Sequence, residues 1–149
     1  MAPSAQRRAG TPAGLSGTDL ATARGVATSA PNQSAGIAGE DLACAELHRR
    51  GYAILARRYR TRYGEIDIVS ERAGVVVFVE VKARRTNRRG LAAESIPLWK
   101  RRRIGSMALD YLAWSGRSHA RCRFDVVAID GLGTSGQTLK VIEGAFDWK

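Results

Sequence analysis

The fold is decided by the stretch VVVFVEVK at residues 75–82, which is the clearest strand in the chain. Valine and phenylalanine occupy both of its faces, as is typical of a central strand covered on both sides. Glu80 and Lys82 are two residues apart and therefore point to the same face. A carboxylate at such a position is costly unless a cation meets it, so this strand predicts a site as well as a sheet.

The flanking segments predict an α/β domain, a mixed β-sheet flanked by helices in the order α-β-β-β-α-β with a short last strand left open. The third strand, the long helix after it and the fourth strand are expected to form one right-handed crossover unit. The expected ranges are a helix over 36–50, strands over 52–59, 64–69 and 75–82, a helix over 97–115, a strand over 123–130 and the short strand over 139–142.

The second expected strand alternates between its two faces. Strand periodicity puts Ile66 and Ile68 on one side, and Glu65, Asp67 and Val69 on the other. If this strand and the central strand form a hairpin, Asp67 can approach a second carboxylate on the central strand. Two carboxylates that converge repel each other, and a divalent cation relieves that repulsion. Oxygen ligands of this kind suit Mg²⁺, which keeps several of its waters.

Two more charges are turned inward by helical periodicity. Glu40 lies on the apolar stripe of the first helix, and Lys100 lies four residues before Ile104 on the stripe of the long helix. Carboxylates that hold a metal, a lysine near the attacking water and further cations are what phosphodiester hydrolysis requires. The five inward charges are Glu40, Asp67, Glu80, Lys82 and Lys100.

Each charge also has a purely structural interpretation. Glu80 and Lys82 could form a buried ion pair, and Glu40 could complement the dipole in the first turn of its helix. Lys100 could reach out to solvent. Glu65 is expected to be a surface acid paired with an arginine, with a role as an extra ligand left open.

The composition favours a polyanionic partner. Lysine and arginine total 24 against 14 acids, which leaves a net charge of +10. A basic run over 82–103 flanks the expected site, so we expect contacts to nucleic-acid phosphates there. Trp99, Tyr59 and Tyr63 could stack on bases, although packing is the expected use. The residues expected to contact nucleic acid are Lys100, Arg103, Arg84, Arg85, Arg88 and Arg89.

Other features exclude whole classes of protein. No apolar run is long enough to span a membrane. Two cysteines are too few for a disulfide scaffold and favour a reducing cytoplasm. Residues 1–34 are rich in Ala, Ser, Gly, Thr and Pro and lack aromatic residues. Such a segment is expected to be a disordered tail, which leaves residues 35–149 as one domain.

The spacing of the acids resembles a known nuclease motif. Asp67, twelve further residues and then Glu80-Val81-Lys82 resemble the PD-(D/E)xK motif, with Ile66 in place of its proline. A helical glutamate ahead of the motif, such as Glu40, resembles the arrangement in archaeal Holliday-junction resolvases. More closely, the chain is similar to the YraN family, which is restriction-endonuclease-like. The similarity covers nearly all of residues 36–146 and includes the stretches 39–40, 64–68, 77–82 and 123–127.

This resemblance implies roles for individual residues. Asp67 and Glu80 would bind Mg²⁺, for which Mn²⁺ could substitute, with help from the carbonyl of Val81. Lys82 would position or deprotonate the attacking water. Glu40 would be an auxiliary carboxylate, acting directly or through water. The site would lie at one end of the sheet.

Three hypotheses about function follow. The first is a metal-dependent endonuclease acting on DNA, including branched or structured DNA. The second is a non-catalytic nucleic-acid-binding module that retains the nuclease fold. The third, which the sequence favours least, is an interaction protein whose acidic cluster is a structural pair. Resolvases of this fold often act as two-fold dimers, so a homodimer is left open.

Overall fold

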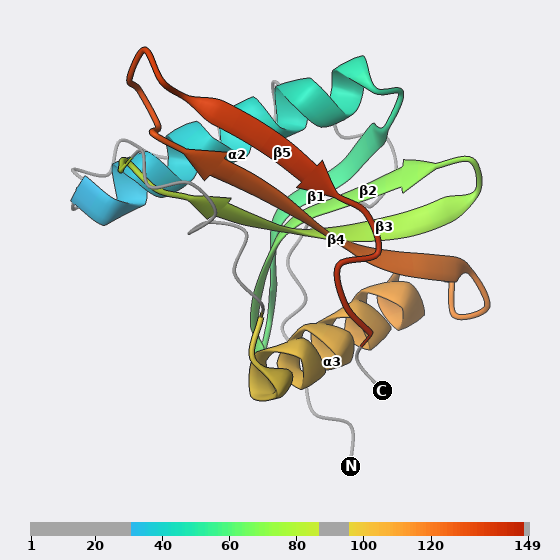
Figure 1. Cartoon of the computed structure of the whole chain (residues 1–149). Helices are drawn as coiled ribbons and strands as arrows, with labels where there is room; N and C mark the ends of the chain where they lie inside the picture. The colour runs from blue at the N-terminus through green and yellow to red at the C-terminus, as the bar shows by residue number, and fades with distance from the viewer. Residues whose placement is uncertain (1–30, 87–95, 148–149) are drawn as a thin grey trace.

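The computed structural model describes residues 31–86 and 96–147, the first five of them by backbone alone. Two helices and five strands make up this part of the chain (Figure 1). They are α2 (Pro31–Arg49), β1 (Ala53–Thr61), β2 (Gly64–Arg72), β3 (Val75–Ala83), α3 (Leu98–Trp114), β4 (Arg121–Asp130) and β5 (Thr138–Ile142). Neither of these helices is long and apolar enough to cross a membrane.

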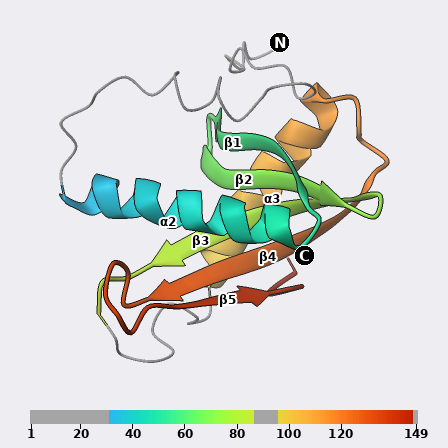
Figure 2. The ribbon, with the colours of Figure 1, turned by 90° about the horizontal axis from the view of Figure 1, so that it is seen from above.

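The strands form one mixed sheet in the order β1-β2-β3-β4-β5. The β1–β2, β2–β3 and β4–β5 pairs are antiparallel, whereas β3 and β4 are parallel and α3 connects them along the chain. The sheet lies between α2 and α3 (Figure 2). The predicted α/β class, the order of elements and the short last strand are therefore confirmed.

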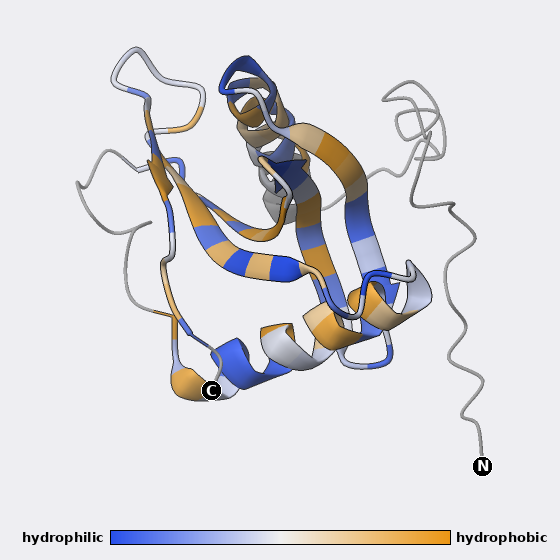
Figure 3. Ribbon diagram, turned by 90° about the vertical axis from the view of Figure 1, so that its right-hand side faces the viewer, coloured by the Kyte–Doolittle hydropathy of each residue, from blue (hydrophilic) through white to orange (hydrophobic). Residues whose placement is uncertain are grey.

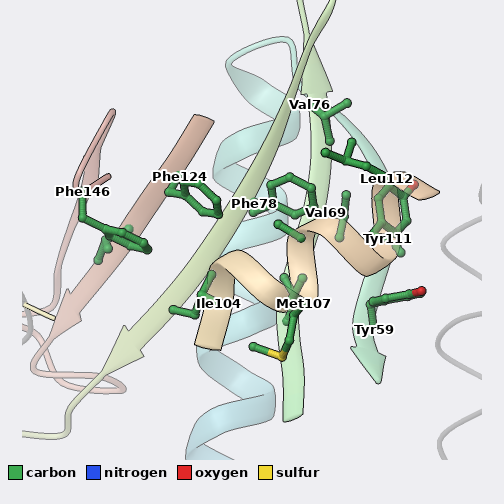
Figure 4. Packing of buried hydrophobic residues seen from close by; sticks show 14 of the residues in the cluster. Tyr59, Val69, Val76, Phe78, Ile104, Met107, Tyr111, Leu112, Phe124 and Phe146 are labelled. Carbon is green, nitrogen blue, oxygen red and sulfur yellow. The ribbon is translucent and has the colours of Figure 1, made fainter. Parts of the chain in front are cut away.

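Strand β3 supplies side chains to two separate cores. Val76 and Phe78 pack on the side of α3, where Phe78 stacks on Phe124 with ring centroids 5.6 Å apart (Figure 4). Val77 and Val79 pack on the side of α2. Figure 3 shows that apolar parts of the strands lie between the two helices. A strand that is buried on both faces must be apolar at almost every position, which explains the run at residues 75–79.

Strand β2 departs from the predicted alternation. Ile66 packs with Val69 on the α3 side, whereas Ile68 packs on the α2 side. The prediction that Ile66 and Ile68 share a face was therefore wrong. The cause is a local irregularity, because Arg58 on β1 has a left-handed backbone with φ of 52°. It forms no regular pair with Asp67, although the positions on either side are paired.

Helix α2 begins at Pro31, five residues before its predicted start, so residues 31–34 of the expected tail are helical. The disorder predicted for the rest of the tail falls on residues 1–30, which lie outside the described residues. Gly39 is buried where α2 meets β3. A Cβ atom built on it would lie 2.7 Å from the Cβ of Ala83. Glycine here allows the helix to approach β3 closely.

A buried ion pair fixes the stretch at residues 123–127. Asp125 is fully buried and accepts hydrogen bonds from Arg123 at 2.8 and 3.0 Å and from the backbone N–H of Gly144 at 3.0 Å. The same guanidinium donates to the hydroxyl of Tyr52. These bonds satisfy the charge and tie the segment after β5 to β4. This stretch therefore has a structural explanation.

We expect Gly39→Ala to destabilise the domain by about 1–3 kcal/mol, because the methyl group would collide with Ala83. Gly36→Ala on the same helix is the matched control, since nothing lies within 4 Å of its Cβ position. That control should stabilise the domain by about 0.5–1 kcal/mol through helix propensity. Urea unfolding measures both changes. Equal stability of Gly39→Ala and the wild type would contradict the close approach.

Candidate functional site

The predicted acids meet where β2 and β3 separate. The last regular pair between these strands is Ile68 with Val79, so Asp67 and Glu80 occupy the next opposed positions. Instead of continuing the ladder, the N–H of Val81 donates to Oδ2 of Asp67 at 2.7 Å. Beyond this point the β1–β2 hairpin bends toward α3 while β3 continues away from it (Figures 1 and 3). The site therefore lies at the fork between the two strands.

The surroundings disfavour a negative charge on Asp67. Burial of the carboxyl group and the nearby charge of Glu80 raise the pKa of Asp67 to about 8, against the opposing effect of the hydrogen bond from Val81. Glu40 and Glu65 add smaller effects in the same direction as Glu80. Perturbation of this kind is common at functional sites. The structure therefore brings Asp67 and Glu80 together, as the sequence predicted.

Glu80 has a cation partner from the opposite helix. Nζ of Lys100 lies 2.6 Å from Oε2 of Glu80, and both side chains are largely buried. The structural interpretations of a Glu80–Lys82 pair and of a solvated Lys100 are therefore wrong. Lys82 is half-buried on β3 and forms no ion pair with any acid in the described segments.

Glu40 comes to the same region from α2. Its side chain is 7 % exposed, and Oε1 lies 2.9 Å from Nε of Arg58 and 3.6 Å from Arg57. Glu40 lies in the middle of α2 and not in the first turn, so the interpretation as a dipole-complementing acid was wrong. Its charge acts on Asp67. Glu40 is thus placed beside the acidic pair but is already neutralised by two arginines.

The remaining candidates are distributed over the surface. Glu65 pairs with Arg60 at 3.1 Å, which confirms the expected surface ion pair. Arg84 and Arg85 are exposed just after β3, and Arg103 is exposed on α3. The remaining two predicted contacts, Arg88 and Arg89, lie outside the described residues.

The donor set suits one kind of metal. Within residues 31–86 and 96–147, no group of three or more histidine, cysteine or acidic side chains lies close enough together to hold a metal ion. Mg²⁺ does not require such a group, since one or two carboxylates with waters and a substrate phosphate complete its shell. Asp67 and Glu80 supply two adjacent carboxylates whose mutual repulsion a cation would relieve. These residues therefore fit Mg²⁺.

Arg58 is a residue of this site that sequence reasoning missed. The sequence assigned Arg58 no role in the site, yet its side chain binds the buried Glu40. Its left-handed backbone interrupts the pairing opposite Asp67. The inward position of Glu40 was the available signal, because a buried acid requires a cation. No sequence pattern predicts a positive φ at an arginine.

The raised pKa of Asp67 makes a prediction about stability in the presence of a chelator. Between pH 4 and 8 the folded chain keeps a proton on Asp67 that the unfolded chain has lost, so this carboxyl lowers stability as pH rises. Asp67→Asn keeps an acceptor for Val81 and removes the titration. We expect the variant to gain more than about 1 kcal/mol over the wild type between pH 5 and pH 8. Denaturant unfolding at both pH values measures the gain, and a difference independent of pH would contradict it.

The part of the chain that carries this site is similar in sequence to known proteins. Residues 39–129 match the profile of the Uncharacterised protein family UPF0102. The UPF0102 protein of Symbiobacterium thermophilum is 42 % identical over 111 residues, covering 74 % of this chain and 94 % of that protein. Those of Rhodococcus jostii and Geobacter sulfurreducens are 46 % and 40 % identical, covering 67 % and 78 % of this chain and 85 % and 91 % of theirs. The chain belongs to the UPF0102 family, which is also called the YraN family.

Proposed function

We propose that this protein is a metal-dependent endonuclease that hydrolyses phosphodiester bonds in DNA. One observation carries the proposal: two carboxylates, Asp67 and Glu80, are opposed at a fork between strands. The half-buried Lys82 follows two residues later on the same face of β3. Lys100 offsets the charge of Glu80, but no cation meets Asp67 in the described residues, and its raised pKa is what a bound cation would reverse.

In this proposal Asp67, Glu80 and the carbonyl of Val81 would hold Mg²⁺ or Mn²⁺, with Glu40 as an auxiliary carboxylate. The ion would neutralise the acids and stabilise negative charge on the phosphate. Oδ2 of Asp67 is oriented by the N–H of Val81, so its other oxygen is available to a ligand. Arg57 and Arg58 limit the negative charge that Glu40 contributes.

Two lysines carry the remaining chemistry. Lys82 orients or deprotonates the water whose oxygen attacks phosphorus while the bond to the leaving oxygen breaks. Lys100 binds Glu80 in the structure. A cation held by Glu80 would release the ammonium of Lys100, which could then contact the scissile phosphate. In this proposal Lys100 offsets the charge of Glu80 before substrate binds and the charge of the phosphate afterwards.

The charge of the chain supports a nucleic-acid substrate. The net charge of +10 favours a polyanion. Exposed arginines follow two of the elements that carry site residues. Arg84 and Arg85 come directly after β3, and Arg103 lies on α3, one turn after Lys100. Contacts of this kind hold the backbone without reading sequence.

We expect Asp67→Asn to reduce metal-dependent cleavage by at least about 100-fold, because one of the two metal-binding carboxylates is lost. Glu65→Gln is the matched control on the same strand and should keep near-wild-type activity, since Glu65 is paired with Arg60. The assay uses labelled single-stranded, duplex, flap and four-way-junction DNA with Mg²⁺, Mn²⁺ or chelator.

Binding to the same DNAs separates catalysis from recognition. Asp67→Asn should bind with affinity within about threefold of the wild type, because its basic surface is unchanged. A wild-type chain that binds the panel but cuts none of it in either metal would contradict the nuclease proposal. That result would favour a binding module that retains the fold.

A further inference from the structure

Two aromatic side chains next to the site are exposed instead of packed. Trp99 in the first turn of α3 is 63 % exposed, and Tyr63 in the β1–β2 turn is 40 % exposed. Tyr59, by contrast, is buried against Tyr111 with ring centroids 5.1 Å apart (Figure 4). The expectation that these aromatics pack holds for Tyr59 and is wrong for the other two.

Each exposed ring has an arginine over its face. The guanidinium of Arg62 lies 4.9 Å from the ring centroid of Tyr63, and that of Arg103 lies 5.2 Å from that of Trp99. Among the described residues, no acid forms an ion pair with Arg62 or Arg103. Their charge is therefore available to an anionic partner.

The two pairs belong to one surface. A Cβ atom built on Gly64, the residue after Tyr63, would lie 3.9 Å from Nε of Arg103 and 3.5 Å from the sulfur of Met107. The β1–β2 turn therefore packs on α3 beside the arginine that covers Trp99, as the descent of this hairpin to α3 shows (Figure 1). Lys100, the residue after Trp99, contacts Glu80. One end of the surface therefore lies one residue along α3 from a side chain of the candidate site.

We infer that Tyr63 and Trp99, with Arg62 and Arg103, form a stacking surface for unpaired bases of DNA. This inference rests on the proposed function, because it requires that the chain bind DNA. Aromatic rings stack on bases of any sequence while arginines meet the backbone. In a duplex the base faces are hidden within the stack, so this surface selects DNA with a single-stranded segment. The inference names the substrate class of the adjoining site.

Base stacking can be separated from phosphate binding by a matched pair of ligands. Fluorescence anisotropy in chelator measures the affinity of the full chain for a labelled oligothymidine. The comparison ligand has the same length and phosphates but abasic sugars. We expect Trp99→Ala to lose about tenfold in affinity for oligothymidine and to bind the abasic strand as the wild type does. Trp99→Phe should restore most of the loss, and Leu109→Ala, at an exposed apolar residue of the same helix, should lose nothing.

Other outcomes would overturn the inference. These are an equal loss of Trp99→Ala on both strands, no loss on either, or a wild type that binds neither. Self-association that disappears in Trp99→Ala, without DNA binding, would assign the surface to a protein contact. The binding assay does not depend on cleavage. If the chain binds bases in this assay but cuts no DNA in the cleavage assay above, the stacking surface is supported and the nuclease proposal is rejected. If the wild type cuts DNA and Trp99→Ala binds both strands as the wild type does, the nuclease proposal is supported and the stacking surface is rejected.

Discussion

The hydrogen bond from Val81 to Asp67 is the interaction on which the site depends. It replaces a ladder bond with a side-chain bond, so β2 and β3 stay joined at the point where their backbones part. The separation of the two strands begins at this bond, between the two helices that cover the sheet. Without that bond a partly buried N–H would have to find another acceptor or lose part of its free energy of hydration.

Charges from three directions are balanced around this fork. The acidic pair comes from the sheet, Lys100 from α3, and Glu40 with its arginines from α2. The contact between Gly39 and Ala83 sets the distance from α2 to β3 and thereby the position of Glu40. The close packing of Gly39 on Ala83 therefore helps to determine where the charge of Glu40 lies. Each of these basic side chains limits the repulsion between the acids.

Much of the fold could be predicted because β3 is so clearly a central strand, and its flanking helices have regular apolar stripes. The buried residues of α3, which include Ile104 and Tyr111, follow that periodicity. The left-handed backbone at Arg58 could not be predicted, since a positive φ at an arginine has no signal in the sequence, and its side chain binds Glu40, which is 18 residues earlier in the chain. For the same reason the alternation of Ile66 and Ile68 failed. Sequence spacing located the carboxylates, but only the structure shows that Glu80 pairs with Lys100 and not with Lys82.

The central claim is that Asp67 and Glu80 form a cation site. Electron paramagnetic resonance of free Mn²⁺ during titration with protein measures this binding without DNA or turnover. We predict binding of Mn²⁺ by the wild type and by Glu65→Gln, competition by Mg²⁺, and loss of binding in Glu80→Gln. Equal binding by the wild type and Glu80→Gln, or none by the wild type at millimolar Mn²⁺, would contradict the account.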